Sequence, residues 1–93
     1  MLVVKQFVFQ LFINPGTIDS THAVKNFQLF CEKYLKGMYE IEVIDIKEHP
    51  GWATKENIFA LPLLIKKMPL PEDRLIGDLS DTKKMLKMLR IEN

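Results

Sequence analysis

The segment KQFVFQLFI, residues 5–13, has the pattern of a strand that is apolar on both faces. Phe, Val, Leu and Ile side chains fill most of its positions, and after Lys5 only Gln6 and Gln10 interrupt them. A strand of this kind is covered on two sides, whereas the strand of a half-exposed sheet alternates apolar and polar residues. We therefore expect an interior strand, in a sheet that carries helices on both faces.

A helix is predicted after this strand. The turn residues NPGTIDS, residues 14–20, offer Asp19 or Ser20 as the N-cap, and Gly37 fits a C-cap. Between these ends, apolar residues recur at spacings of three and four, as on the buried side of a helix. They are Ala23, Val24, Phe27, Phe30, Cys31, Tyr34 and Leu35.

The remaining segments extend an alternating α/β pattern. The sequence predicts a strand at 38–46, a short helix at 52–59, a strand at 61–65 entered through Pro62, a short strand at 73–77, and a helix at 79–90 capped by Ser80. A strand that follows a helix in this way forms a parallel, right-handed βαβ unit. The order βαβαββα is the thioredoxin-like arrangement, and we expect residues 1–93 to form one domain of this α/β class.

Thioredoxin-like redox chemistry would need Cys-x-x-Cys at the start of the first helix, where the helix N-terminus lowers a thiol pKa. This chain has NPGTIDS there, and its single cysteine, Cys31, lies in the apolar stripe. We expect an inert core cysteine, no catalytic residue and no enzymatic activity. Trp52 is expected to cover a small satellite core.

The sequence also lacks the patterns of metal and cofactor sites. His22 and His49 lie in different segments without other ligands at metal-binding spacing, so no metal site is predicted. The four glycines are isolated, which leaves no glycine-rich phosphate loop, and we expect no cofactor. Glu40 and Glu42 share one strand face, which is expected to be solvated.

Charge and hydropathy limit the partners. A net charge of +1 argues against a nucleic-acid partner, which usually meets a strongly basic face. The apolar N-terminus is too short to span a bilayer and lacks a signal cleavage site, so we expect no membrane association and a cytoplasmic location. Lys83, Lys84 and Lys87 suit the negative end of the last helix, or they dock an acidic partner.

The stretch ALPLLIKKMPLPEDRLIGDLSD, residues 60–81, places three prolines in sequence that is otherwise typical of strands. Each proline removes a backbone donor that a sheet would use. A catalytic loop, a partner-binding edge and a segment with two conformations would each explain them.

Residues 39–81 resemble the KaiB family of circadian clock proteins. The family pattern is a strand ending V-I-D-V, a proline a few residues later, I-x-A-x-P-x-L, K-x-x-P-x-P and R-x-I-G-D-L-S. This chain has VIDI at 43–46, Pro50, IFALPLL at 58–64, Lys66 or Lys67 before PLP at 69–71, and RLIGDLS at 74–80.

The resemblance implies a non-enzymatic protein that binds the N-terminal ATPase ring of a KaiC-type ATPase and modulates its cycle, in timekeeping or stress adaptation. KaiB proteins switch between a tetrameric ground-state fold and a monomeric thioredoxin-like state, and slow X-Pro isomerisation gives a physical reason for slow interconversion. The resemblance assigns structural or fold-switch roles to Pro62, Pro69, Pro71, Gly77 and Asp78. A homo-oligomer, dimer or tetramer, is a further implication.

Two departures from the family favour the last helix. Met88 and Arg90 replace a glycine and an aspartate in the segment that is strand in one fold and helix in the other. Removing a helix-interior glycine gains roughly 0.8 kcal/mol, and Arg suits the negative helix end. We therefore expect the thioredoxin-like state to dominate.

The partner surface implied by the family is only partly kept. In the family, basic side chains of this surface meet an acidic loop of KaiC. This chain retains Lys5, but it has Glu42 in the place of a lysine, and His22 and Asn57 replace other basic residues. Either the cognate ATPase carries compensating charges, or the partner is a different protein. A histidine-kinase pathway is the alternative, with this chain as a thioredoxin-like sensor module. The candidate partner-binding residues are Lys5, Gln6, Glu40, Glu42 and Asn57.

Overall fold

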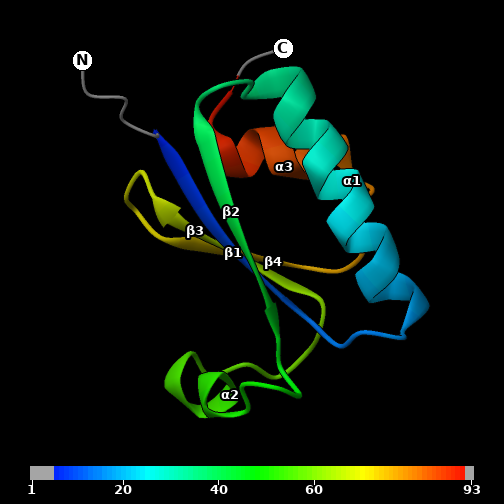
Figure 1. The fold of residues 1–93 in the computed structure, drawn as a ribbon. Coiled ribbons are helices and arrows are strands. Elements are labelled where there is room, and N and C mark those ends of the chain that lie inside the picture. The colour runs from blue at the N-terminus through cyan, green and yellow to red at the C-terminus, as the bar shows by residue number, and fades with distance from the viewer. Residues whose placement is uncertain (1–5, 92–93) are drawn as a thin grey trace.

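Strand β1, Phe7–Ile13, lies in the interior of a four-stranded sheet in the computed structural model, which describes residues 6–91 (Figure 1). The strand order is β2-β1-β3-β4. Strand β2, Tyr39–Asp45, pairs in parallel with β1, while β3, Leu63–Met68, is antiparallel to both β1 and β4, Asp73–Ile76. The predicted interior strand and the predicted parallel crossover are both confirmed.

Within residues 6–91, three helices complete the order β1α1β2α2β3β4α3, which confirms the predicted thioredoxin-like arrangement. Helix α1 spans Ile18–Tyr34, α2 spans Gly51–Lys55 and α3 spans Thr82–Leu89. Figure 1 shows α1 and α3 together against one side of the sheet, with α2 apart from them at its lower end. Helices therefore lie on both faces, but the second face is covered only at one end.

The larger core fills the space between the sheet and the α1/α3 pair. Phe9 of β1 meets Phe27 of α1 edge to face, with ring centroids 4.7 Å apart, a favourable aromatic geometry. Cys31 is fully buried in this core, as its place in the apolar stripe predicts. Met85 and Met88 bring α3 into the same cluster.

A smaller core lies under α2. Its buried members are Phe12, Ile44, Leu63 and Ile65. The Trp52 ring lies 5.5 Å from that of Phe12 and packs on this cluster, so the predicted lid is confirmed.

Several predicted boundaries were wrong. The helix predicted at 52–59 is only five residues long, because Glu56 caps it and Asn57 adopts a left-handed conformation with φ of 52°. Apolar residues after it reach the small core from a loop instead. Strand β3 continues to Met68 because Lys66 pairs with both Phe9 and Asp73.

The predicted helix caps were also displaced. Thr17, rather than Asp19 or Ser20, caps α1 by accepting a hydrogen bond from the Ser20 N–H. Asp81, rather than Ser80, caps α3 by accepting from the Lys84 N–H at 3.1 Å. The competing serines have other partners: the Asn14 N–H donates to Ser20 Oγ, and the Ser80 N–H donates to Asp78. At the far end of α1 the C-cap is Leu35, and Gly37 follows it with φ of 79°.

Candidate partner-binding site and proline-rich segment

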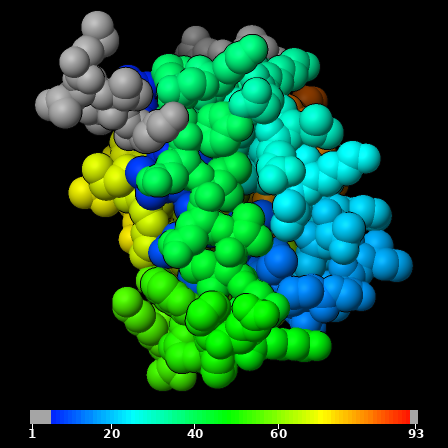
Figure 2. Space-filling view, viewed as in Figure 1, coloured from blue at the N-terminus to red at the C-terminus, as the bar shows by residue number. Residues whose placement is uncertain are grey.

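The open face of β2 carries the acidic pair predicted from the sequence. Strand β2 is an edge strand, and Glu40 and Glu42 are exposed on the face that α2 covers only at its end. Figure 2 shows β2, coloured green, running down the middle of the view with α2 below it. The expectation of a solvated pair on one strand face is confirmed.

Gln10 on β1 is joined to this acidic pair. Its Nε2 atom donates a hydrogen bond to Glu42 Oε1 at 3.1 Å, whereas its Oε1 atom is buried and has no hydrogen-bond partner among residues 6–91. Sequence reasoning treated Gln10 only as an interruption of an apolar run. The signal was present, because a polar residue in an interior strand needs a partner.

The other predicted partner residues lie around this face. Gln6 is exposed directly before β1, and Asn57 is exposed in the loop after α2, next to Ile58, which packs near Ile44 of β2. Lys5 lies outside the described residues. The structure brings Glu40 and Glu42 together, and it leaves Gln6 and Asn57 toward opposite ends of the sheet.

A charged network that the sequence did not reveal occupies the other half of the same face. Glu56 Oε1 lies 2.9 Å from Lys67 Nζ, and its Oε2 lies 3.0 Å from an Arg74 guanidinium nitrogen. Glu72 approaches the same lysine at 3.3 Å. The hydrogen bond to Glu56 is the main reason that the pKa of Lys67 is raised.

This network changes the charge that a partner would meet. Lys67 of β3 and Arg74 of β4 are engaged with Glu56 and Glu72, whereas no salt bridge within the described part of the chain involves Glu40 or Glu42. The open half of the face is therefore acidic.

The three prolines of the 60–81 stretch lie in two different settings. Pro62 is buried directly before β3, and its carbonyl accepts a hydrogen bond from the Gly77 N–H at 3.1 Å. Pro69 and Pro71 are exposed in the connection between β3 and β4. The peptide bonds that precede all three prolines are cis. Pro62 thus contributes to the core, and the other two shape a surface turn.

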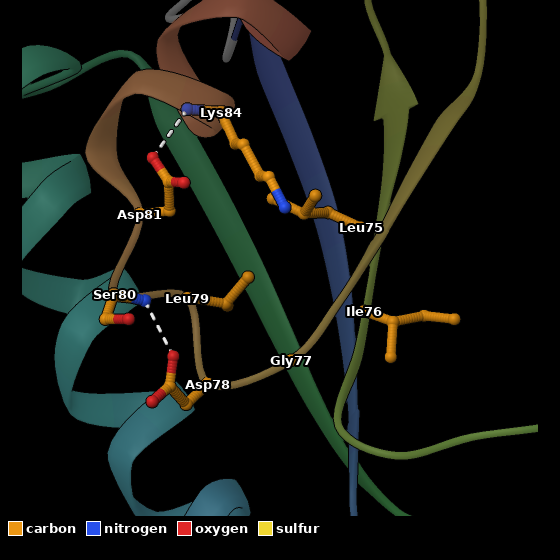
Figure 3. A pocket seen from close by; sticks show the side chains of 8 residues that line it. All are labelled: Leu75, Ile76, Gly77, Asp78, Leu79, Ser80, Asp81 and Lys84. Carbon is orange, nitrogen blue, oxygen red and sulfur yellow. Dashed lines mark hydrogen bonds between the residues drawn. The ribbon is translucent and has the colours of Figure 1, made fainter.

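The connection between β4 and α3 encloses a small cavity of about 200 Å³ (Figure 3). Gly77, with φ of 123°, opens this turn, and Leu79 is buried despite a φ of 61°. Figure 3 shows the Lys84 side chain extending from α3 toward Leu75. The cavity is smaller than the roughly 300 to 1,000 Å³ of small-molecule sites, which favours a structural role for this turn.

Asp78 organises the same turn. Hydrogen bonds from the side chain and backbone of Ser80 hold the pKa of the Asp78 carboxyl below its usual value. The Asp78 carbonyl accepts from Asn26 Nδ2 at 2.9 Å, which ties the turn to α1.

The two residues expected to favour the last helix lie at its end. Met88 is only 8% exposed and packs in the larger core. Arg90 lies one residue beyond the helix, as a C-cap with φ of 57°, so the predicted end at residue 90 was one residue too late. The segment is helix, as predicted for the thioredoxin-like state.

The structure places the single cysteine in the core. Cys31 is fully buried, and this burial raises the pKa of its thiol to about 12. Among residues 6–91, no cluster of three or more His, Cys, Asp or Glu side chains could hold a metal ion. No helix in that range is long and apolar enough to cross a membrane.

Comparison with known proteins identifies sequence relatives over most of the chain. The KaiB domain family model matches residues 10–91. Circadian clock protein KaiB3 of Synechocystis sp. is 39% identical over 79 residues, which are 85% of this chain and 78% of the relative. Circadian clock oscillator protein KaiB of Synechococcus elongatus is 38% identical over 82 residues, 88% of this chain and 80% of the relative.

Solved structures extend the likeness in fold. The N-terminal domain of Synechococcus elongatus SasA has a TM-score of 0.76 at 19% identity and matches 100% of this chain and 92% of that domain. Chloroplastic thioredoxin z has a TM-score of 0.73 at 14% identity, over 92% of this chain and 80% of its own. At these identities the likeness establishes a thioredoxin-like fold and no more.

Proposed function

This chain belongs to the KaiB family, and on that premise we propose that it is a non-enzymatic regulator that binds a KaiC-type ATPase and modulates its cycle. The observation that carries the proposal is the KaiB match over residues 10–91, which includes most of β1, all of β2, β3 and β4, and α3. In the family, the thioredoxin-like state is the one that binds, and this chain has that fold.

The non-enzymatic part of the proposal is supported by the cysteine. A thiol nucleophile must be accessible and ionised near neutral pH. Cys31 is fully buried with its pKa raised to about 12, and the start of α1 carries Thr17 and Ile18 where a redox motif would lie. We therefore propose regulation by binding, and not thiol catalysis, as the role of this chain.

We place the partner on the open β2 face. The proposed contact residues are Lys5, Gln6, Glu40, Glu42 and Asn57. Because Glu40 and Glu42 are exposed and make no salt bridge within residues 6–91, a partner that docks there must supply positive charge or hydrogen-bond donors. The cognate ATPase would then differ in charge from the clock ATPases that meet basic family members.

Co-purification with a candidate KaiC-type ATPase tests this proposal. We expect the native protein to bind. Lys5→Glu and Glu42→Lys should each weaken the affinity for the ATPase by about tenfold, as expected when one member of a close charge pair is reversed. Glu48→Lys is the matched control, because it makes the same charge change on an exposed turn beyond β2. Unchanged binding in Lys5→Glu removes that residue from the site, and equal effects of Glu42→Lys and Glu48→Lys contradict the β2 location.

A histidine-kinase partner, the alternative left open by the sequence, is the second candidate, and the SasA N-terminal domain shares the fold of this chain over its whole length. The same co-purification separates the two. Recovery of a kinase without an ATPase would favour a sensor module and reject the ATPase as the partner.

A further inference from the structure

We propose that residues 47–61, the connection that contains α2, form a flap that opens as one unit and uncovers the small core while the rest of the fold stays closed. This α2 flap begins after Ile46, whose N–H donates to the Ile13 carbonyl, and ends before Pro62, whose carbonyl accepts from the Gly77 N–H. Figure 1 shows α2 at the lower end of the sheet, apart from α1 and α3. Both ends of the flap are therefore anchored to the sheet.

The flap contributes little to the interior of the protein. None of residues 47–61, all of which the structure describes, is buried, and Phe59 is 93% exposed. Within residues 6–91, the backbone of the flap makes hydrogen bonds only to itself and to Asp45, the last residue of β2. A segment with few buried contacts and local hydrogen bonds opens at a lower free energy than the whole protein unfolds.

One carboxylate joins the flap to β3 and β4. Glu56 accepts hydrogen bonds from Lys67 at 2.9 Å and from Arg74 at 3.0 Å. Apart from the bonds to Asp45, no other hydrogen bond joins the flap to the rest of the described chain. The Glu56 side chain is only 12% exposed, so its two ion pairs are partly shielded from solvent. Glu56 is therefore the latch of the flap.

Opening of the flap exposes apolar surface beside the acidic pair of β2. The buried members of the small core lie on β1, β2 and β3, and the partly buried residues that cover them are Ile46, Trp52, Ile58 and Leu61. All of these except Ile46 belong to the flap. Ile44, a buried member, lies two residues after Glu42 and therefore on the same face of β2. The open state thus presents apolar and acidic side chains together.

This opening is smaller than a change of fold. Among residues 6–91, the larger core, which packs α1 and α3 on the sheet, takes no member from the flap. Strands β3 and β4 and helix α3 can therefore keep their places when the flap lifts. Asn57 moves with the flap, so a link between opening and partner binding rests on the proposed function, whereas the opening itself does not.

Native-state hydrogen exchange at increasing urea concentration, read by NMR on the isolated protein, tests the flap. The amides of Ala53, Glu56 and Ile58 report on it, because each donates within the flap. A helix of five residues is not stable without its packing, so opening also exposes these amides. We expect them to exchange at least about tenfold faster than the amides of β3 and α3. Their rates should rise with urea, but less steeply than those of β3, because only part of the apolar surface is exposed.

Three variants separate the flap from the rest of the fold. Glu56→Gln should speed exchange of the flap amides about tenfold. Glu72→Gln is the matched control, because it removes the other carboxylate at Lys67 from outside the flap, and it should change these rates by less than about twofold. Met88→Ala weakens the larger core, so it should speed exchange in β3 and α3 and leave the flap amides unchanged.

Four results would overturn the proposal. Flap amides with the rates and urea dependence of β3 amides would show that the flap opens only in global unfolding. Exchange that does not depend on urea would show fraying that leaves the small core covered. An opening shared with α3 would indicate a change of the whole C-terminal half, and equal effects of Glu56→Gln and Glu72→Gln would remove Glu56 as the latch. The first three come from the native protein alone, so they hold whether or not a variant folds or an ATPase binds.

Discussion

The Oε1 atom of Glu56 lies 2.9 Å from the Nζ atom of Lys67, which ties the end of α2 to the middle of the sheet. The side chain of Glu56 is only 12% exposed, and its second oxygen binds Arg74 of β4 at 3.0 Å. Helix α2 itself has no buried residue. This carboxylate, together with Trp52, is therefore what holds the short helix on its face of the sheet.

Replacing Glu56 with glutamine should lower the free energy of unfolding by about 1 to 3 kcal/mol, because Lys67 loses the nearer of its two carboxylates and Arg74 loses the carboxylate that it binds. Glu72→Gln, a change at an exposed position, is the matched control and should cost less than about 1 kcal/mol. Urea denaturation measures both, and hydrogen exchange should show faster opening of residues 51–58 only in Glu56→Gln. Equal losses in the two variants would contradict the central role of Glu56.

Asp81→Ala should lower the free energy of unfolding by about 1 kcal/mol, because the variant loses the N-cap of α3. Its carboxylate accepts from the Lys84 N–H at 3.1 Å, whereas Ser80 makes its contacts within the preceding turn. Ser80→Ala is the control and should be less damaging, by thermal or urea unfolding. A larger loss in Ser80→Ala would restore the cap predicted from the sequence.

Comparing Met88→Gly with Met88→Ala isolates the helix preference of the α3 segment. Both changes remove a buried side chain, which is 8% exposed in the native protein, and glycine adds a backbone penalty of about 1 kcal/mol. We expect Met88→Gly to be the less stable variant by that amount, measured by urea unfolding. If NMR also showed residues 82–89 of Met88→Gly as strand, position 88 would select between the thioredoxin-like fold and the ground-state fold of the family. Equal stability of the two variants would contradict the helix-propensity argument.

The sequence was sufficient for the order of elements because apolar periodicity is a local property. It placed β1 between covering layers, Cys31 in the core and Glu40 with Glu42 on one exposed face. It failed at element ends, where side chains compete for the same backbone donors. Ser20 is a good capping residue, yet its hydroxyl accepts from the Asn14 N–H, and Thr17 takes the cap.

The candidate site was less accessible to sequence reasoning, because its contacts join distant segments. Gln10 and Glu42 are 32 residues apart, and Glu56 and Arg74 are 18 apart. Neither pair follows a helix or strand period. The acidic character of the open face depends on which cations are already engaged, and only the packing of β3 and β4 determines that.

The stability of the protein should fall with rising pH in a way that depends on Cys31. Burial, with a smaller contribution from the charge of Glu32, raises the pKa of this thiol from 9.0 to about 12. Above pH 9 the unfolded chain loses the thiol proton while the native protein keeps it, so the native state binds more protons and becomes less stable as pH rises toward 12. Below pH 9 both states are protonated, and the thiol has no effect on the pH dependence.

Urea unfolding of the native protein and of Cys31→Ala, at pH 8 and pH 11 under reducing conditions, measures this effect. The alanine variant loses a fixed amount of packing at both pH values, but it lacks the thiol ionisation. Other titrating groups are common to both proteins and cancel in the difference. We therefore expect the stability advantage of the native protein to shrink between pH 8 and pH 11, and native Cys31 to resist thiol reagents until the protein unfolds. A pH-independent advantage, together with rapid labelling of the folded protein, would mean that the thiol is accessible and would reopen a redox role.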